Sequence, residues 1–166
     1  MDKYIIGIDN GVSGSVGCVH VEGGQTYYYK IPVKKQLNYT KTKKWINRID
    51  TDKLKELLQF KAIEIVYLER PMVNPGRFQA TASALRALEA TLIVIESLKL
   101  SYAYIDSKEW QSVLLPKELK GDELKTASLD IGKRLFPTID FKGFKDADGL
   151  LIAEYGKRKV NKNERD

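Results

Sequence analysis

The sequence predicts an α/β fold in which helices cover both faces of a five-stranded mixed sheet. Three short apolar segments near the N-terminus are separated only by turn residues, which is typical of an antiparallel meander. Two later apolar segments alternate with segments of helical periodicity, which indicates parallel strands joined by right-handed crossovers. The 166 residues suit one hydrophobic core, so we expect a single domain over residues 1–166.

The meander accounts for the first three strands. Residues 4–8 form a continuous apolar run ending at Asp9, which is typical of a central strand covered on both faces. A turn-rich segment follows, and residues 16–22 are expected to form the second strand. A Gly-Gly pair at positions 23–24 is a two-residue hairpin signal, so residues 25–31 are expected to return as the third strand.

The middle of the chain predicts two helices around the fourth strand. Residues 34–44 are polar and basic, and we expect a loop there. Residues 51–60 carry leucines on one helical face, and residues 62–68 form an apolar strand that ends at Glu69. Residues 79–98 predict a long helix. Its second half is apolar nearly all round, so we expect cover from the sheet and from a partner subunit.

The C-terminal part predicts the fifth strand and three helices. Residues 102–105 form the short strand, and the sequence DSKE at 106–109 is a capping-box pattern that opens a helix. Residues 121–135 predict the next helix. The last helix is expected to begin at Asp146, with a charged and frayed tail from Lys157.

Composition narrows the function classes. The net charge of +6 and the pI of about 9.2 favour a polyanionic partner. The chain lacks a run of 18 apolar residues and a signal-like N-terminus, so we expect neither a membrane span nor secretion. The single cysteine, Cys18, excludes an internal disulfide and a multi-cysteine zinc site. These features predict an intracellular, cytoplasmic protein.

Four acidic residues occupy positions where chemistry is expected. Asp9 and Glu69 each follow an apolar strand, and Asp146 and Asp148 lie at the start of the last helix. If the first and fourth strands are parallel neighbours, their carboxyl ends meet at one edge, where ligands of α/β sheets bind. Two carboxylates about 4 Å apart repel by about 4 kcal/mol at an effective dielectric of about 20. Mg²⁺ or Mn²⁺ would remove this repulsion, and two such ions about 3.5–4 Å apart can drive phosphodiester hydrolysis.

Each acid also has a purely structural interpretation. Asp9 can be a turn residue, and Glu69 can pair with Arg70 or Arg77. Asp146 can be a helix N-cap, and Asp148 can be an acid of the first turn that complements the helix dipole. The joint pattern of two strand ends and one helix start is more specific than any single residue.

Four motifs, in order along the chain, resemble those of the RuvC-like Holliday junction resolvases. The sequence IGIDNG at residues 6–11 is similar to the family's opening acidic strand, and YLE at 67–69 to its second acidic strand. KTAS at 125–128 resembles the lysine-bearing segment, and DGLLIA at 148–153 resembles the acidic ending. The resemblance covers nearly the whole chain.

This resemblance implies a ribonuclease H-like fold, a homodimer and Mg²⁺-dependent cleavage of two strands across a four-way junction. Asp9, Glu69 and Asp148 match family metal ligands. The family's fourth acid lies three residues before the last one, where this chain has Lys145. Asp146 can replace it only if the helix begins after Asp146, because helical positions two apart point about 200° from each other.

The resemblance also assigns residues to the transition state and to DNA. Lys125 matches a lysine that neutralises the scissile phosphate or the transition state; the alternative is a solvated first-turn lysine. An aromatic residue after the second acid can wedge into the junction, so Met72 or Phe78 is a candidate, although core packing is expected for Phe78.

A basic run with interleaved aromatics suits phosphate contact, the alternative being a solvated loop. The predicted DNA contacts are Lys34, Lys35, Lys41, Lys43, Lys44, Arg77 and Lys108.

Three other functions stay open at the level of sequence. The same acids would serve a ribonuclease H-like nuclease that cuts RNA–DNA hybrids or flaps. An actin-like or sugar-kinase ATP-binding domain also opens with an Asp-x-Gly loop, but that architecture needs two such domains. A junction-binding protein without catalysis would fit the displaced fourth acid.

Overall fold

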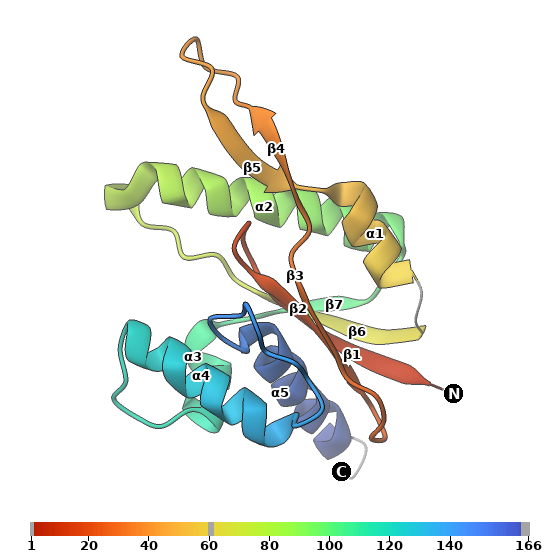
Figure 1. Ribbon diagram of the computed structural model, residues 1–166. Coiled ribbons are helices and arrows are strands. Elements are labelled where there is room, and N and C mark those ends of the chain that lie inside the picture. The colour runs from red at the N-terminus through yellow and green to blue at the C-terminus, as the bar shows by residue number, and fades with distance from the viewer. Residues whose placement is uncertain (1, 60–61, 164–166) are drawn as a thin grey trace.

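The computed structural model describes residues 2–59 and 62–163 and places a five-stranded sheet between two groups of helices (Figure 1). The strand order is β3-β2-β1-β6-β7. Strands β1, β2 and β3 are antiparallel, whereas β6 is parallel to β1 and β7 is parallel to β6. This is the predicted mixed sheet of a meander plus two parallel strands. Its strands are β1 (Lys3–Asp9), β2 (Ser15–His20), β3 (Tyr27–Lys30), β6 (Ala62–Glu69) and β7 (Tyr102–Ile105).

Two hydrophobic cores form because successive residues of the central strand point to opposite faces. Ile6 packs with Leu54 and Ile95 under helices α1 (Thr51–Gln59) and α2 (Phe78–Ser97). Ile5 packs with Leu150 on the other face, which α3 (Ser107–Leu114), α4 (Asp122–Leu135) and α5 (Asp148–Asn163) cover. Helices on both faces explain why the first strand is apolar throughout.

Helix α5 approaches the sheet unusually closely because three glycines meet at the contact. A Cβ atom on Gly7 would lie 2.3 Å from the carbonyl oxygen of Gly149, and one on Gly17 would lie 2.5 Å from the same oxygen. The amide of Gly149 donates to the Ser15 hydroxyl at 3.0 Å. This contact fixes the N-terminus of α5 above the ends of β1 and β2.

A second sheet, which the sequence analysis missed, replaces the expected basic loop. Strands β4 (Val33–Leu37) and β5 (Trp45–Ile49) pair antiparallel and project beyond α2, away from the main sheet (Figure 1). The turn between them is held by Asn38, whose backbone N–H donates to the Lys44 carbonyl at 2.9 Å and whose side chain accepts from Thr40 at 2.7 Å. We call residues 33–49 the basic hairpin.

Smaller differences concern element ends. The two-residue turn predicted after the second strand is wrong, because β2 ends at His20 and β3 begins only at Tyr27. The DSKE segment does start a helix, but the side chain of its N-cap residue, Asp106, makes no capping hydrogen bond and lies 3.4 Å from Arg70 Nε. Helix α5 continues to Asn163 instead of fraying, since Lys159 pairs with Glu109 at 3.0 Å.

One helical segment, Pro75–Ser97, is long and apolar enough to cross a membrane by length and composition alone. The structure gives these residues another role, because Ala87, Val94 and Ile95 are buried against the main sheet. One face of the helix therefore packs on the sheet, whereas only 22% of its most apolar stretch is buried.

Candidate active site

The acidic residues singled out in the sequence meet at one edge of the sheet. Asp9 ends β1 and Glu69 ends β6, and these parallel strands are neighbours. The closely packed start of α5 brings Asp146 and Asp148 to the same place. One carboxylate oxygen from each of Asp9, Asp146 and Asp148 lies within 4.8 Å of the others, and Glu69 is near enough for its charge to act on Asp9.

Burial and mutual repulsion shift the acid–base properties of this cluster. Burial raises the pKa of Asp9 well above its usual range, and the charges of Glu69, Asp148 and Asp146 raise it further. Burial and the adjacent Asp146 raise the pKa of Asp148 to about 6. Burial also raises the pKa of Glu69, although hydrogen bonds from Trp110 and other neighbours oppose this shift. A cation bound among these carboxylates would therefore relieve a real electrostatic penalty.

Lys125 lies against the acids, and its side chain is half-buried. Its Nζ lies 3.2 Å from Asp146 Oδ2. Burial disfavours the Lys125 ammonium, but the charges of Asp146, Asp148 and Asp9 outweigh this effect and raise its pKa. Lys125 is thus a fixed positive charge at the rim of the cluster.

Two buried residues that the sequence analysis missed orient the acids. Trp110 Nε1 donates to Glu69 Oε2 at 2.6 Å, and the Trp110 side chain is fully buried. Ser128 Oγ donates to Asp148 Oδ1 at 2.5 Å and accepts from the Ala147 amide at 3.0 Å. Ser128 ends the KTAS motif, so its position was visible in the sequence, but its partner was not.

The structure contradicts one of the purely structural interpretations of the acids and also locates Asp146 relative to the last helix. The ion pair suggested for Glu69 with Arg70 is wrong, because Arg70 lies against Asp106 instead. Helix α5 begins at Asp148, so Asp146 precedes the helix and meets the condition set for it. Asp146 Oδ1 also accepts the Asp148 backbone N–H at 3.2 Å, a local turn contact that leaves its other oxygen facing Lys125.

The donor set fits a hard divalent cation. All the donors are carboxylate oxygens, which Mg²⁺ and Mn²⁺ prefer to the nitrogen and sulfur ligands of softer metals. Oxygens on opposite sides of one Mg²⁺ are about 4.2 Å apart, twice the usual ligand distance of about 2.1 Å. The Asp9, Asp146 and Asp148 oxygens lie within 4.8 Å of one another, which is close to that span.

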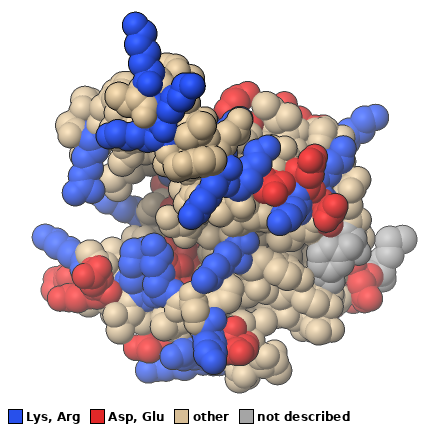
Figure 2. All heavy atoms as spheres, turned by 45° about the horizontal axis from the view of Figure 1, so that its top comes forward, with Lys and Arg blue, Asp and Glu red and all other residues tan. Residues whose placement is uncertain are grey.

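The predicted DNA-contacting residues lie on three separate elements of the structure. Lys34 and Lys35 belong to β4 and Lys41, Lys43 and Lys44 to the turn of the basic hairpin. Figure 2 shows Lys and Arg side chains on this projection and around a hollow in which acidic side chains are visible. Beyond the hairpin, exposed Arg77 ends the 3-10 turn η1 (Pro75–Arg77), and exposed Lys108 lies in the first turn of α3.

Phe78 does not join the core, so that part of the prediction is wrong. Its side chain is 73% exposed, and that of Met72 is 81% exposed. Phe78 is the first residue of α2 and lies beyond the edge of the sheet, because the chain leaves β6 at Glu69 before the helix starts. Both side chains are therefore free to contact a partner.

The comparisons with known proteins agree with this architecture. No family model and no curated protein sequence matches the chain. Among solved structures, it is similar to Thermus thermophilus RuvC, with 16% identity, a TM-score of 0.60 and coverage of 96% of both chains. T. thermophilus RuvC in complex with a Holliday junction substrate gives 16% identity and a TM-score of 0.58, covering 91% of this chain and 90% of that one. The yeast mitochondrial Holliday junction resolvase Ydc2 gives 14% identity and a TM-score of 0.57, covering 97% and 80%. The chain therefore has a RuvC-like, ribonuclease H-like fold.

Proposed function

We propose that this chain, with its RuvC-like fold, is a metal-dependent endonuclease that resolves four-way DNA junctions by paired phosphodiester hydrolysis. The observation that carries the proposal is the convergence of Asp9, Asp146 and Asp148 oxygens within 4.8 Å, beside Glu69, at the carboxyl ends of two parallel strands. The likeness to a RuvC bound to a Holliday junction supports the choice of substrate.

The four acids would hold the divalent cations. Asp9 lies centrally, since the charges of Glu69, Asp148 and Asp146 all act on it. When bound, two Mg²⁺ or Mn²⁺ ions supply an activated water on one side of the phosphodiester and stabilise the leaving oxygen on the other. Trp110 and Ser128 keep the Glu69 and Asp148 carboxyl groups oriented, so that little reorganisation is needed when substrate arrives.

Lys125 would stabilise the negative charge of the scissile phosphate. Its ammonium lies 3.2 Å from Asp146 Oδ2. From this position at the rim of the acids, the Lys125 ammonium would donate to a phosphate oxygen in the transition state.

The basic hairpin would bind the phosphate backbone of a junction arm, together with Arg77 and Lys108. Lys34 lies directly opposite Arg48 across the two strands, and like charges in that arrangement are destabilising. Arg48 partly avoids Lys34 by donating to Gln36 at 2.7 Å. A phosphate placed over this pair would neutralise both charges.

A homodimer would supply the two sites that paired incisions require. Helix α2 leaves Phe78, Leu85 and Ile93 exposed, and the preceding segment exposes Met72 and Val73. A second copy covering α2 would bury this apolar surface.

Incision mapping on a synthetic four-way junction tests the proposed function, with flap, RNA–DNA hybrid and linear duplex as parallel substrates. We expect symmetric cuts in the junction in Mg²⁺, none in EDTA, and none by Asp9→Asn, which should still bind the junction. Preferred cutting of the hybrid or flap would identify a different ribonuclease H-like nuclease. Equal cutting by Asp9→Asn and the parent protein would refute the role of the acids.

A further inference from the structure

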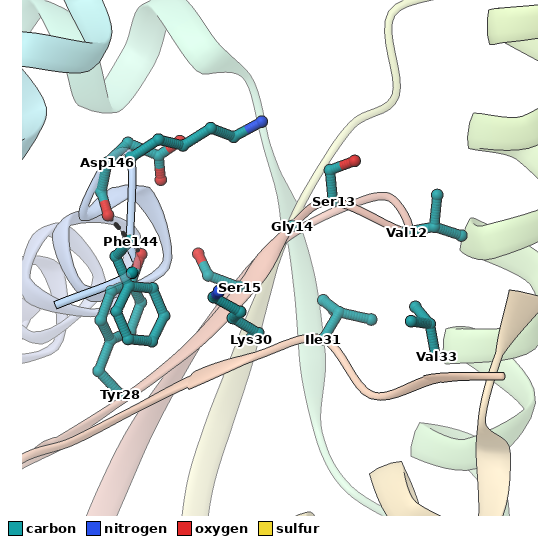
Figure 3. Close-up of a pocket in the computed structure, with 12 residues that line it drawn as sticks. Val12, Ser13, Gly14, Ser15, Tyr28, Lys30, Ile31, Val33, Phe144 and Asp146 are labelled. Carbon is teal, nitrogen blue, oxygen red and sulfur yellow. Dashed lines mark hydrogen bonds between the residues drawn. The ribbon is translucent and has the colours of Figure 1, made fainter. Parts of the chain in front are cut away.

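A cavity lies beside the acidic cluster and shares Asp146 with it. Its volume is about 300 Å³, and it opens between the chain before α5 and the ends of β2 and β3 (Figure 3). This volume is at the lower end of the roughly 300–1,000 Å³ range of ligand pockets, which suits one nucleotide rather than a duplex. We call it the flanking pocket; Tyr28, Lys30, Phe144, Lys145 and Asp146 are among its lining residues.

The pocket is continuous with the proposed catalytic site. Asp146 contributes both to its lining and to the acidic cluster. A second cavity of about 310 Å³ is lined by Asp9 and Lys125, and the two cavities share Val12, Gly14 and Lys145 as part of their walls. A DNA strand whose scissile phosphate lies at the acids would therefore pass its neighbouring nucleotide into the flanking pocket.

The sheet register sets the distance between the two places. Lys30 pairs with Ser15 in the β2–β3 ladder, and Ser15 pairs with Asp9 in the β1–β2 ladder. Two strand spacings separate the backbones of Lys30 and Asp9 by about 10 Å. The backbone phosphate next to the one being cut would thus come within reach of the long Lys30 side chain.

The pocket offers a π surface for a base and cations for a phosphate. Phe144 stacks on Tyr28 with ring centroids 4.3 Å apart, and the Tyr28 hydroxyl donates to the Asp146 carbonyl at 3.0 Å. The aromatic pair is therefore fixed relative to the acidic cluster. Lys30 Nζ lies 5.5 Å from the Phe144 ring centroid, and Lys145 is exposed at the rim. Base stacking on an aromatic ring beside basic side chains is how proteins hold single-stranded nucleotides.

We propose that the flanking pocket binds the nucleotide adjacent to the scissile phosphate, with its base against Phe144 and its phosphate at Lys30 and Lys145. This inference rests on the proposed function, because it takes the acids as the place where the strand is cut. It makes the pocket the part of the protein that selects and immobilises the nucleotide at the cut.

Abasic substitution tests the pocket directly. Each test junction carries a single abasic site, placed at one of the positions on either side of the mapped cut. Single-turnover cleavage of each junction by the parent protein is then measured. We expect a loss of about tenfold at one adjacent position, the size of one base–aromatic contact, and changes below about twofold elsewhere. Phe144→Leu keeps the apolar bulk without the ring, so it should slow the intact junction about tenfold and make cleavage insensitive to the abasic site.

A charge comparison and a metal-free measurement complete the test. Lys30→Gln should slow cleavage, whereas Lys55→Gln, a matched loss of one exposed lysine on α1, should not. A 2-aminopurine base at the same position, bound in EDTA, should be quenched by the parent and not by Phe144→Leu. If the abasic site slows cleavage by the same factor in the parent protein and in Phe144→Leu, the proposed role of the pocket is wrong. A protein that binds the junction and quenches the base but never cuts it would refute the proposed function and leave the pocket supported. Failure to bind any junction would refute both.

Discussion

Asp148→Asn should stabilise the metal-free protein while abolishing its proposed activity. Burial and Asp146 raise the pKa of Asp148 from 3.8 to about 6 in the folded state. At 1.36 kcal/mol per pKa unit, this difference corresponds to about 3 kcal/mol against the folded state when the carboxyl is ionised. An asparagine keeps an oxygen to accept the Ser128 hydrogen bond and carries no charge.

The pH dependence has a defined sign. A carboxyl whose folded pKa is raised binds its proton more tightly in the folded state, so stability falls as pH rises from about 4 to about 6 and the full penalty persists above pH 6. Urea denaturation in EDTA should therefore give Asp148→Asn an advantage of about 3 kcal/mol at pH 8 that fades toward pH 4. Mg²⁺ should stabilise the parent much more than the variant. Asp130→Asn, a change at an exposed acid on α4, serves as the control. An equal stability of variant and parent at pH 8, or an advantage independent of pH, would refute the electrostatic reasoning.

Three further predictions address packing, chemistry and binding. Gly17→Ala places a Cβ 2.5 Å from backbone atoms of α5, so overpacking should lower the free energy of unfolding by about 3 kcal/mol; a loss below about 0.5 kcal/mol in urea denaturation would contradict the close contact. Lys125→Ala should slow single-turnover cleavage more than it weakens junction binding, and the reverse order would make Lys125 a plain phosphate contact. Lys41→Gln with Lys43→Gln should reduce the salt dependence of junction binding by about 0.9 in log–log slope for each lysine, and an unchanged slope would remove the basic hairpin from the interface.

The main sheet could be predicted because its signals are local. Residues 4–8 and 62–68 are continuous apolar runs, and such runs occur where helices cover both faces of a strand. The basic hairpin could not be predicted in this way. Lys34 and Lys35 are residues depleted in strands, and both strands are exposed along most of their length, so neither shows the alternation of a half-buried strand. Its turn is closed by hydrogen bonds of Asn38, which a polar segment does not reveal.

The acids could be found from local sequence signals, whereas the residues that orient them could not. Asp9 and Glu69 were found from their own surroundings, since each ends an apolar strand. Trp110 and Ser128 act on acids 41 and 20 residues away in the chain. A buried tryptophan and a helical serine have many structural uses, so only the folded geometry distinguishes these two.

The start of α5 links the altered acid pattern to the flanking pocket. Because the helix begins at Asp148, Asp146 precedes it and lies against Lys125, while Lys145 lines both cavities. The resolvases that the sequence resembles have an acid at the place of Lys145. In this chain the acid is the next residue, Asp146. Asp146 lies with Asp9 and Asp148 at the edge of the sheet, and the exposed Lys145 adds a positive charge beside them. Under the proposed function, a DNA strand held at the acids would carry its next phosphate there.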